Sequence, residues 1–134
     1  MAGCRRQVVV TSAPGAPGAA TAREAVQLFM ASAKTQDLQA MANVWGSSAG
    51  PIRNTIPADE VEKRSIYIMR CLRHDTYSIL GEVQIAGGER GFTVEVRRGN
   101  LTPRADFNTT QGPENRWFVR IFELEKLNPI CASQ

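Results

Sequence analysis

The stretch DTYSILGEVQIAGGERGFTVEV, residues 75–96, decides the fold, because apolar side chains recur in it at every second position. This period of two is typical of β-strands that bury one face. Gly87 and Gly88 lie between two such runs and have the chemistry of a hairpin turn. The alternating positions are Tyr77, Ile79, Gly81, Val83 and Ile85 before the turn, and Phe92, Val94 and Val96 after it. We therefore expect two antiparallel strands here.

Two more strands are expected towards the C-terminus. Residues 101–110 form a weaker strand, in which Pro103 predicts an edge or a bulge. A polar turn at 111–115 leads to a last strand that we expect from Arg116 to Leu127. One face of this strand carries Trp117, Val119 and Ile121, and the other carries Phe118, Phe122 and Leu124. A strand that is apolar on both sides is typical of the middle of a sheet or of an oligomer interface, so we expect a sheet-mediated homodimer.

The residues before position 75 have helical periodicity. Thr21 and Glu24 are spaced as in a capping box, and an apolar stripe with intervals of three and four follows. The stripe comprises Ala22, Ala25, Val26, Phe29, Met30 and Ala33. A second helix is expected from about Asp37 to Gly46, and a third is expected to start at Asp59, whose side chain would cap it. The predicted fold class is α+β, with N-terminal helices packed on an antiparallel sheet.

The first twenty residues differ in composition from the rest of the chain. Residues 11–20 (TSAPGAPGAA) are small and rich in Pro and Gly, which favours a flexible linker over a packed element. We therefore divide the chain into a flexible tether, residues 1–20, and a single α+β domain, residues 21–134.

The excess of positive charge lies near the beginning of the chain. The formal net charge is +3, yet residues 58–134 hold eleven basic and eleven acidic side chains. A nucleic-acid surface needs clustered Lys and Arg on the folded part, so nucleic acid is not an expected partner. The sequence has no run of about 18 apolar residues, so we expect contact with a membrane only through a lipid anchor.

Side chains with catalytic chemistry are scattered along the sequence. His74 has a suitable intrinsic pKa for proton transfer, but its place at a helix end beside Asp75 indicates capping and pairing. Glu95 and Asp106 lie among basic and polar neighbours, as is typical of a solvated strand face. With one histidine and no closely spaced cysteine pair, the sequence predicts no metal centre, no cofactor site and no catalytic set.

The order of elements and several apolar motifs resemble the nuclear transport factor 2-like superfamily. The resemblance rests on residues 25–30 (AVQLFM), on Asp37-Leu38, Met41 and Trp45, and on residues 116–121 (RWFVRI). It implies a curved sheet that wraps around the long first helix as a cone, with a pocket at the open end. The superfamily includes isomerases, dehydratases, hydrolases and non-catalytic binding modules, so it does not by itself select a function. Its isomerase-like members use a tyrosine hydroxyl and acidic groups, for which this chain offers Tyr67, Tyr77, Glu95 and Asp106.

The four residues Met1-Ala2-Gly3-Cys4 resemble the cleavage box of a bacterial lipoprotein, in which the cysteine is acylated. The Pro- and Gly-rich tether that follows fits the spacer that a lipid-anchored domain needs. We expect an upstream signal segment and a mature protein that begins at lipidated Cys4, whereas the alternative is an ordinary cytoplasmic start. If Cys4 carries lipid, Cys71 and Cys131 would form a disulfide in an oxidising envelope; buried free thiols are the alternative.

These observations give one leading hypothesis and one alternative. The leading hypothesis is a non-enzymatic binding or interaction domain, anchored in the bacterial cell envelope, with a small apolar ligand or a protein as partner. The alternative is a small pocket enzyme of the isomerase or dehydratase type. Titratable groups that converge in the interior would favour the enzyme, and an interior filled with apolar side chains would favour the binding domain.

Overall fold

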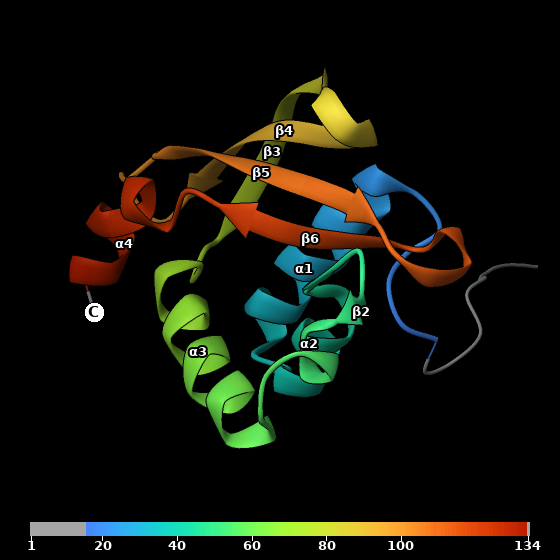
Figure 1. Cartoon of the computed structure of the whole chain (residues 1–134). Helices are drawn as coiled ribbons and strands as arrows, with labels where there is room; N and C mark the ends of the chain where they lie inside the picture. The colour runs from blue at the N-terminus through green and yellow to red at the C-terminus, as the bar shows by residue number, and fades with distance from the viewer. Residues whose placement is uncertain (1–15, 134) are drawn as a thin grey trace, which may run out of the picture.

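Helix α1 packs across one face of a four-stranded antiparallel sheet in the structure, a computed structural model that describes residues 16–133 (Figure 1). The described α-helices are α1 (Ala22–Thr35), α2 (Leu38–Val44), α3 (Ala58–Cys71) and α4 (Asn128–Ala132). The main sheet has the order β3 (Thr76–Ile85), β4 (Glu89–Arg97), β5 (Arg104–Gln111) and β6 (Trp117–Phe122). A two-stranded sheet joins β1 (Gly46–Ser47) to β2 (Gly50–Pro51). The predicted α+β class, with helices before a four-stranded meander, is confirmed.

The core lies between α1 and the sheet. The stripe predicted for the first helix is buried throughout: Ala22, Ala25, Val26, Phe29, Met30 and Ala33. The ring of Phe29 lies against Phe107 of β5 and Phe122 of β6, with ring centroids 6.1 and 5.2 Å apart. Because large aromatic side chains bury the most apolar area, this cluster of three rings fixes α1 on the sheet.

The starts of two helices differ in how well the sequence predicts them. Thr21 caps α1 as expected, since its hydroxyl accepts a hydrogen bond from the backbone N–H of Glu24 at 3.1 Å. The predicted start of the third helix at Asp59 is wrong, because α3 begins directly after Pro57. Proline fixes its own φ near the value needed at this position, so the helix starts without a side-chain cap. Asp59 lies instead in the first turn, where negative charge favours the helix dipole.

The last strand is shorter and differently placed than its sequence predicts. Strand β6 ends at Phe122, and residues 124–127 form a 3-10 turn that leads into α4. Leu127 and Ile130 are fully buried there, so their apolar side chains pack this helical segment into the core instead of extending the strand. Of the two positions that its apolar faces indicated, the middle of the sheet is excluded, because β6 is an edge strand. The sheet-mediated homodimer stays a prediction.

Residues 16–20 are bound to this edge strand. Ala19 and Trp117 exchange two backbone hydrogen bonds of 2.9 and 2.8 Å, and Ala19 is fully buried. The guanidinium of Arg116 donates to the carbonyls of Pro17 and Gly18, both at 3.0 Å. The described fold therefore includes residues that composition alone assigns to the tether, because a small-residue segment suits close packing on a strand edge as well as a linker.

Three glycines surround the ring of Phe118, which is buried outside the main core. A Cβ atom added to Gly18, Gly46 or Gly112 would lie 2.9, 2.9 or 2.8 Å from a carbon of this ring. Side chains essentially never approach so closely. A larger residue at any of these positions would therefore clash. The segments before α1, after α2 and after β5 all contact the Phe118 ring through these glycines.

Gly112→Ala, whose added Cβ would lie nearest to the Phe118 ring at 2.8 Å, is expected to lower the free energy of unfolding by about 1–3 kcal/mol, the usual effect of overpacking a filled site. The matched control is Gly81→Ala, where an added Cβ meets nothing within 4 Å. That control should leave stability unchanged or raise it by about 0.4–1 kcal/mol. Urea denaturation of both variants measures the difference, and equal stability of the two would contradict the packing described around Phe118.

A disulfide joins Cys71 at the end of α3 to Cys131 in α4, with the two Cα atoms 4.2 Å apart. The bond ties the C-terminal helix to the helical layer across a sequence separation of 60. In the chain-entropy account, a loop of this length stabilises a fold by about 4 kcal/mol, since it restricts the unfolded chain.

We expect the double variant Cys71→Ala, Cys131→Ala to unfold at lower urea concentration, with a loss of about 4 kcal/mol relative to the oxidised protein. Wild-type protein kept in reductant serves as the control and should approach the variant. Intact mass after alkylation without reductant gives a second measurement. Two thiols that alkylate freely in protein isolated under oxidising conditions would contradict the bond.

Candidate functional site

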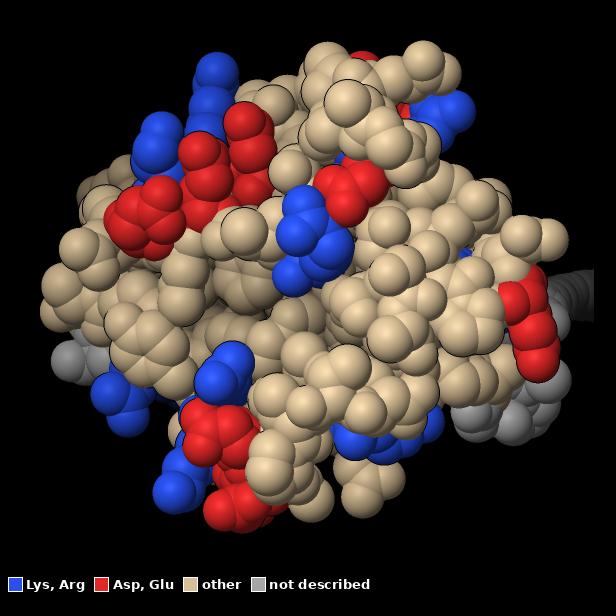
Figure 2. Space-filling view, in the orientation of Figure 1, with Lys and Arg blue, Asp and Glu red and all other residues tan. Residues whose placement is uncertain are grey.

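A groove of about 480 Å³ lies between α3 and β6. Figure 2 shows a hollow on this face of the molecule, with basic side chains above and below it. Its apolar lining comes from three parts of the chain: Trp45 after α2, Tyr67 and Ile68 on α3, and Ile121, Phe122 and Leu124 in and after β6. Its size lies within the range of about 300–1,000 Å³ that is usual for small-molecule sites.

A β-bulge in β6 creates one wall of the groove. The strand pairs Ile121 with Asn108 but Val119 with Thr109, which leaves Arg120 as an extra residue. The side chain of Val119 is buried in the core, whereas Ile121 is 50% exposed and lines the groove. The alternation of residues 117–122 places Val119 and Ile121 on one face, so the sequence pattern cannot reveal this wall.

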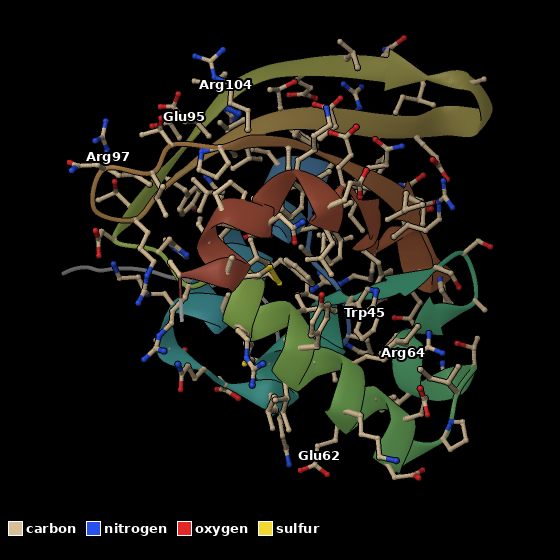
Figure 3. The ribbon with its side chains drawn as sticks, turned by 90° about the vertical axis from the view of Figure 1, so that its left-hand side faces the viewer. Trp45, Glu62, Arg64, Glu95, Arg97 and Arg104 are labelled. Atoms are coloured by element: carbon tan, nitrogen blue, oxygen red, sulfur yellow. A yellow bond between two sulfur atoms is a disulfide. The ribbon has the colours of Figure 1, made fainter. Side chains whose placement is uncertain are left out.

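The floor and the opposite wall are held by backbone contacts of Trp45 and by helix α3. The N–H of Trp45 donates to Met41 at 2.9 Å, and its carbonyl accepts from Ile52 at 2.8 Å. Figure 3 shows Trp45 and Arg64 close together at one side of α3. Trp45 is nearly buried, but Tyr67 is 52% exposed, so the α3 wall presents an aromatic surface to solvent.

Three cations border the groove. The guanidinium of Arg64 pairs with Glu60 at 3.1 Å, and that of Arg120 pairs with Glu89 at 2.6 Å. Lys63 has no hydrogen-bond or ion-pair partner among residues 16–133. Exposed ion pairs contribute only about 0–1 kcal/mol, so Arg64 can exchange its partner for an incoming anion at little cost, whereas Arg120 is held by two contacts to the largely buried Glu89. The rim therefore favours a negatively charged group.

His74 lines a second cavity, of about 410 Å³, between the end of α1 and the start of β3. Its Nδ1 donates to the carbonyl of Leu72 at 2.6 Å, so it caps the end of α3 as the sequence indicates. The expected pairing with Asp75 is not made, because the Asp75 carboxylate accepts from the N–H of Gly99 at 2.8 Å. Burial lowers the pKa of His74, and burial raises the pKa of Tyr77, whose ring edge contacts the imidazole.

The acidic groups considered from the sequence lie elsewhere. Glu95 pairs across strands with Arg104 at 3.2 Å, and both side chains lie together in Figure 3. Asp106 accepts from the Thr93 hydroxyl at 2.9 Å. The α3–β6 groove is lined by Tyr67 but by no carboxylate and no imidazole, and Tyr77 lines the other cavity. The structure does not bring these tyrosines and acids together in one pocket.

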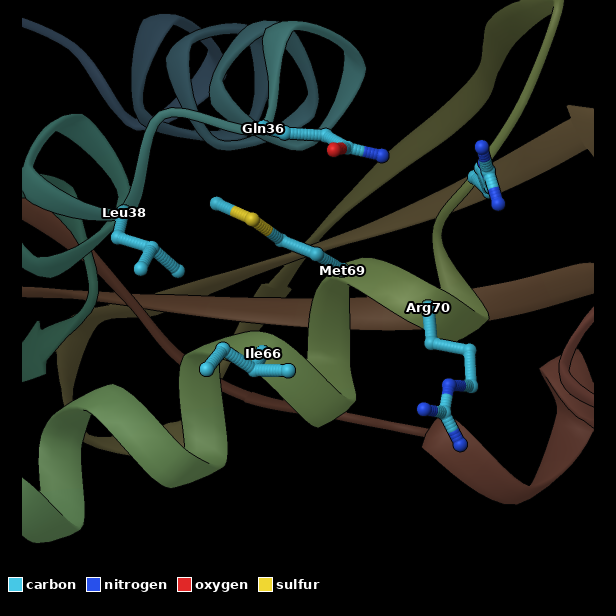
Figure 4. A pocket seen from close by; sticks show the side chains of 6 residues that line it. Gln36, Leu38, Ile66, Met69 and Arg70 are labelled. Carbon is cyan, nitrogen blue, oxygen red and sulfur yellow. The ribbon is translucent and has the colours of Figure 1, made fainter.

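A third cavity, between the α1–α2 turn and α3, is lined by Gln36, Leu38, Ile66, Met69 and Arg70 (Figure 4). Its volume of about 260 Å³ is below the usual range for a small-molecule site. Its lining divides equally between apolar side chains and the polar Gln36, Arg70 and Arg73. The larger α3–β6 groove is therefore the stronger candidate.

The predicted lipidation residue, Cys4, lies outside the described residues. Within residues 16–133, no group of three or more His, Cys, Asp or Glu side chains is arranged to hold a metal ion. The described helices also include none that is long and apolar enough to cross a membrane. The chain matches no protein-family model, no curated protein and no solved structure.

Proposed function

We propose that this chain is a non-enzymatic binding domain, of the nuclear transport factor 2-like type, whose α3–β6 groove holds a small apolar molecule with an anionic group. One observation carries the proposal: Tyr67 of α3 and Ile121 of β6 both line a groove of ligand size, and each is about half exposed. Water-exposed apolar walls that a ligand would cover provide a hydrophobic driving force for binding.

The charges around the groove select the kind of ligand. Lys63, Arg64 and Arg120 are the charged residues of its lining, and Lys63 has no partner in residues 16–133. A carboxylate at the rim would gain an ion pair with Lys63, while an alkyl or aryl body would lie against the apolar walls. Neutral apolar molecules would gain only the second contribution.

The filled interior supports binding over catalysis. The space between α1 and the sheet is occupied by Phe29, Phe107 and Phe122, whose rings are in mutual contact. The alternative, an isomerase or dehydratase, needs an acid and a base beside the substrate. The groove offers Tyr67 and cations without a carboxylate or imidazole, the groups that most often act as a general base. The titratable groups of the second cavity include Lys34 and Asp75, but both are engaged with backbone groups.

Decanoate is the probe for this proposal, and Trp45 is the reporter. Trp117→Phe leaves Trp45 as the only tryptophan, since the chain has two. Titration with decanoate should change Trp45 fluorescence saturably, and decanol should bind more weakly. Lys63→Gln should weaken decanoate binding about 1.4- to fivefold without affecting decanol, because an exposed ion pair contributes about 0.2–1 kcal/mol.

The matched pair of variants is Ile121→Asp and Val83→Asp. Both residues are exposed apolar side chains of the main sheet, at 50% and 62%, but only Ile121 lines the groove. Ile121→Asp should abolish decanoate binding, and Val83→Asp should leave it unchanged, with both variants folded by circular dichroism. Equal effects of the two substitutions, or no saturable response at all, would refute the proposed site.

We also propose that the domain is held in the bacterial cell envelope by a lipid on Cys4. The proposal rests on Ala2-Gly3-Cys4 and on the small-residue stretch that follows. In cells that express the complete gene, the protein should partition into detergent, and Cys4→Ser should move it to the aqueous phase. Ser12→Ala, in the same stretch, is the control and should partition like the wild type. Aqueous partitioning of all three proteins would contradict the anchor and favour the cytoplasmic alternative.

A further inference from the structure

The cavity beside His74 differs from the groove in its charge and in its hydrogen-bonding groups. Its lining combines apolar surface from Met30, Ala31 and the Tyr77 ring with a few polar atoms. It lies between the last turns of α1 and the segment that leads from α3 into β3. Its volume of about 410 Å³ is sufficient for a molecule with one ring.

The geometry of His74 fixes which of its nitrogens can receive a hydrogen bond. The carbonyl of Leu72 only accepts, so the Nδ1 that contacts it at 2.6 Å carries the hydrogen. In the neutral ring Nε2 is then an acceptor, and it has no partner among residues 16–133. The side chain is more than nine-tenths buried. Nε2 is not a buried atom, since the one buried side-chain nitrogen or oxygen without a partner in residues 16–133 is the Ser65 hydroxyl; Nε2 is therefore an acceptor that a molecule entering the cavity can reach.

A second acceptor lies nearby. The hydroxyl of Thr35 donates to the carbonyl of Ala31 at 3.1 Å, which leaves its oxygen free to accept. The charged groups of the cavity are already engaged: Lys34 donates to the carbonyl of Asp75, and the Asp75 carboxylate accepts from Gly99. One positive and one negative charge therefore border the cavity together, so neither an anion nor a cation is favoured.

We propose that this cavity binds a small neutral alcohol or phenol, whose hydroxyl donates a hydrogen bond to Nε2 of His74. The apolar body of the ligand would lie against Met30, Ala31 and Tyr77. This site is separate from the α3–β6 groove, and it differs from it in accepting a neutral donor instead of an anion.

The site has a defined dependence on pH. The groups that face His74 are Lys34 of α1, and Asp75 and Tyr77 of the segment entering β3. Burial lowers the pKa of His74 below 6.5; the hydrogen bond to Leu72 opposes this, Lys34 lowers the pKa further, and Asp75 raises it slightly. The imidazole is therefore neutral at pH 7, and only this form accepts at Nε2. Affinity should be constant above the pKa of His74 and should fall about tenfold per pH unit below it.

The single histidine makes the test direct, because every imidazole signal in the full 134-residue chain comes from His74. Para-cresol is the probe, and its isomer anisole, which has no hydroxyl hydrogen to donate, is the comparison. In NMR titrations at pH 7.5, para-cresol should shift the imidazole ¹⁵Nε2 resonance saturably. Anisole should bind about three- to tenfold more weakly, as expected for the loss of one hydrogen bond.

Ala31→Leu fills the cavity from an exposed position on α1, so the fold is expected to remain intact. Ala40→Leu, at an exposed position on α2, is the matched control. Ala31→Leu should weaken para-cresol binding at least tenfold, and Ala40→Leu should not change it. Equal binding of anisole, tighter binding at low pH, or the absence of a saturable shift of His74 would each overturn the proposal.

Discussion

Strand β6 is the edge of the main sheet, and two other segments pair with its backbone there. Ala19, which precedes α1, pairs with Trp117, and Trp45, which follows α2, pairs with Val119. Buried N–H and C=O groups must find partners, so the edge strand is completed by segments from both sides of the first two helices. The helical layer is thereby bound to the sheet by backbone contacts as well as by the Phe29 cluster. Both the glycine-lined Phe118 and the floor of the groove depend on this pairing.

The sequence predicts the regular parts of the fold because their signals are local. The stripe of α1, the Thr21 cap and the alternation of β3 and β4 each depend on neighbouring residues. The features that the sequence does not predict depend on tertiary contacts. They are the bulge at Arg120, the helical conformation of the segment with Leu127 and Ile130, and the burial of Ala19. Two apolar faces indicate the middle of a sheet or an oligomer interface, whereas here segments from outside the sheet pair with the strand at the edge. The groove arises from the same nonlocal features, so pattern analysis alone identifies Tyr67 and Trp45 without joining them.

The two cavities of this small domain differ in the polar and charged groups that line them. The α3–β6 groove combines half-exposed apolar walls with cations on its rim. The cavity at His74 combines apolar walls with hydrogen-bond acceptors and balanced charges. Elements at different ends of α3 supply the two sets of residues. Ligands of the two proposed sites would therefore differ in their polar group, since both linings include apolar side chains.

The attachment of residues 16–20 to β6 also determines the order in which the chain can complete its fold. Arg116 holds Pro17 and Gly18 across separations of 99 and 98 positions. A ribosome releases the early segment long before β6 exists, and contacts between distant residues form slowly. Until β6 has emerged, the backbone of Ala19 and the glycine faces that will meet Phe118 have no partner. The first described residues of this domain therefore reach their native contacts last. A chain truncated before Arg116 would lack the strand to which these residues and the helical layer are bound.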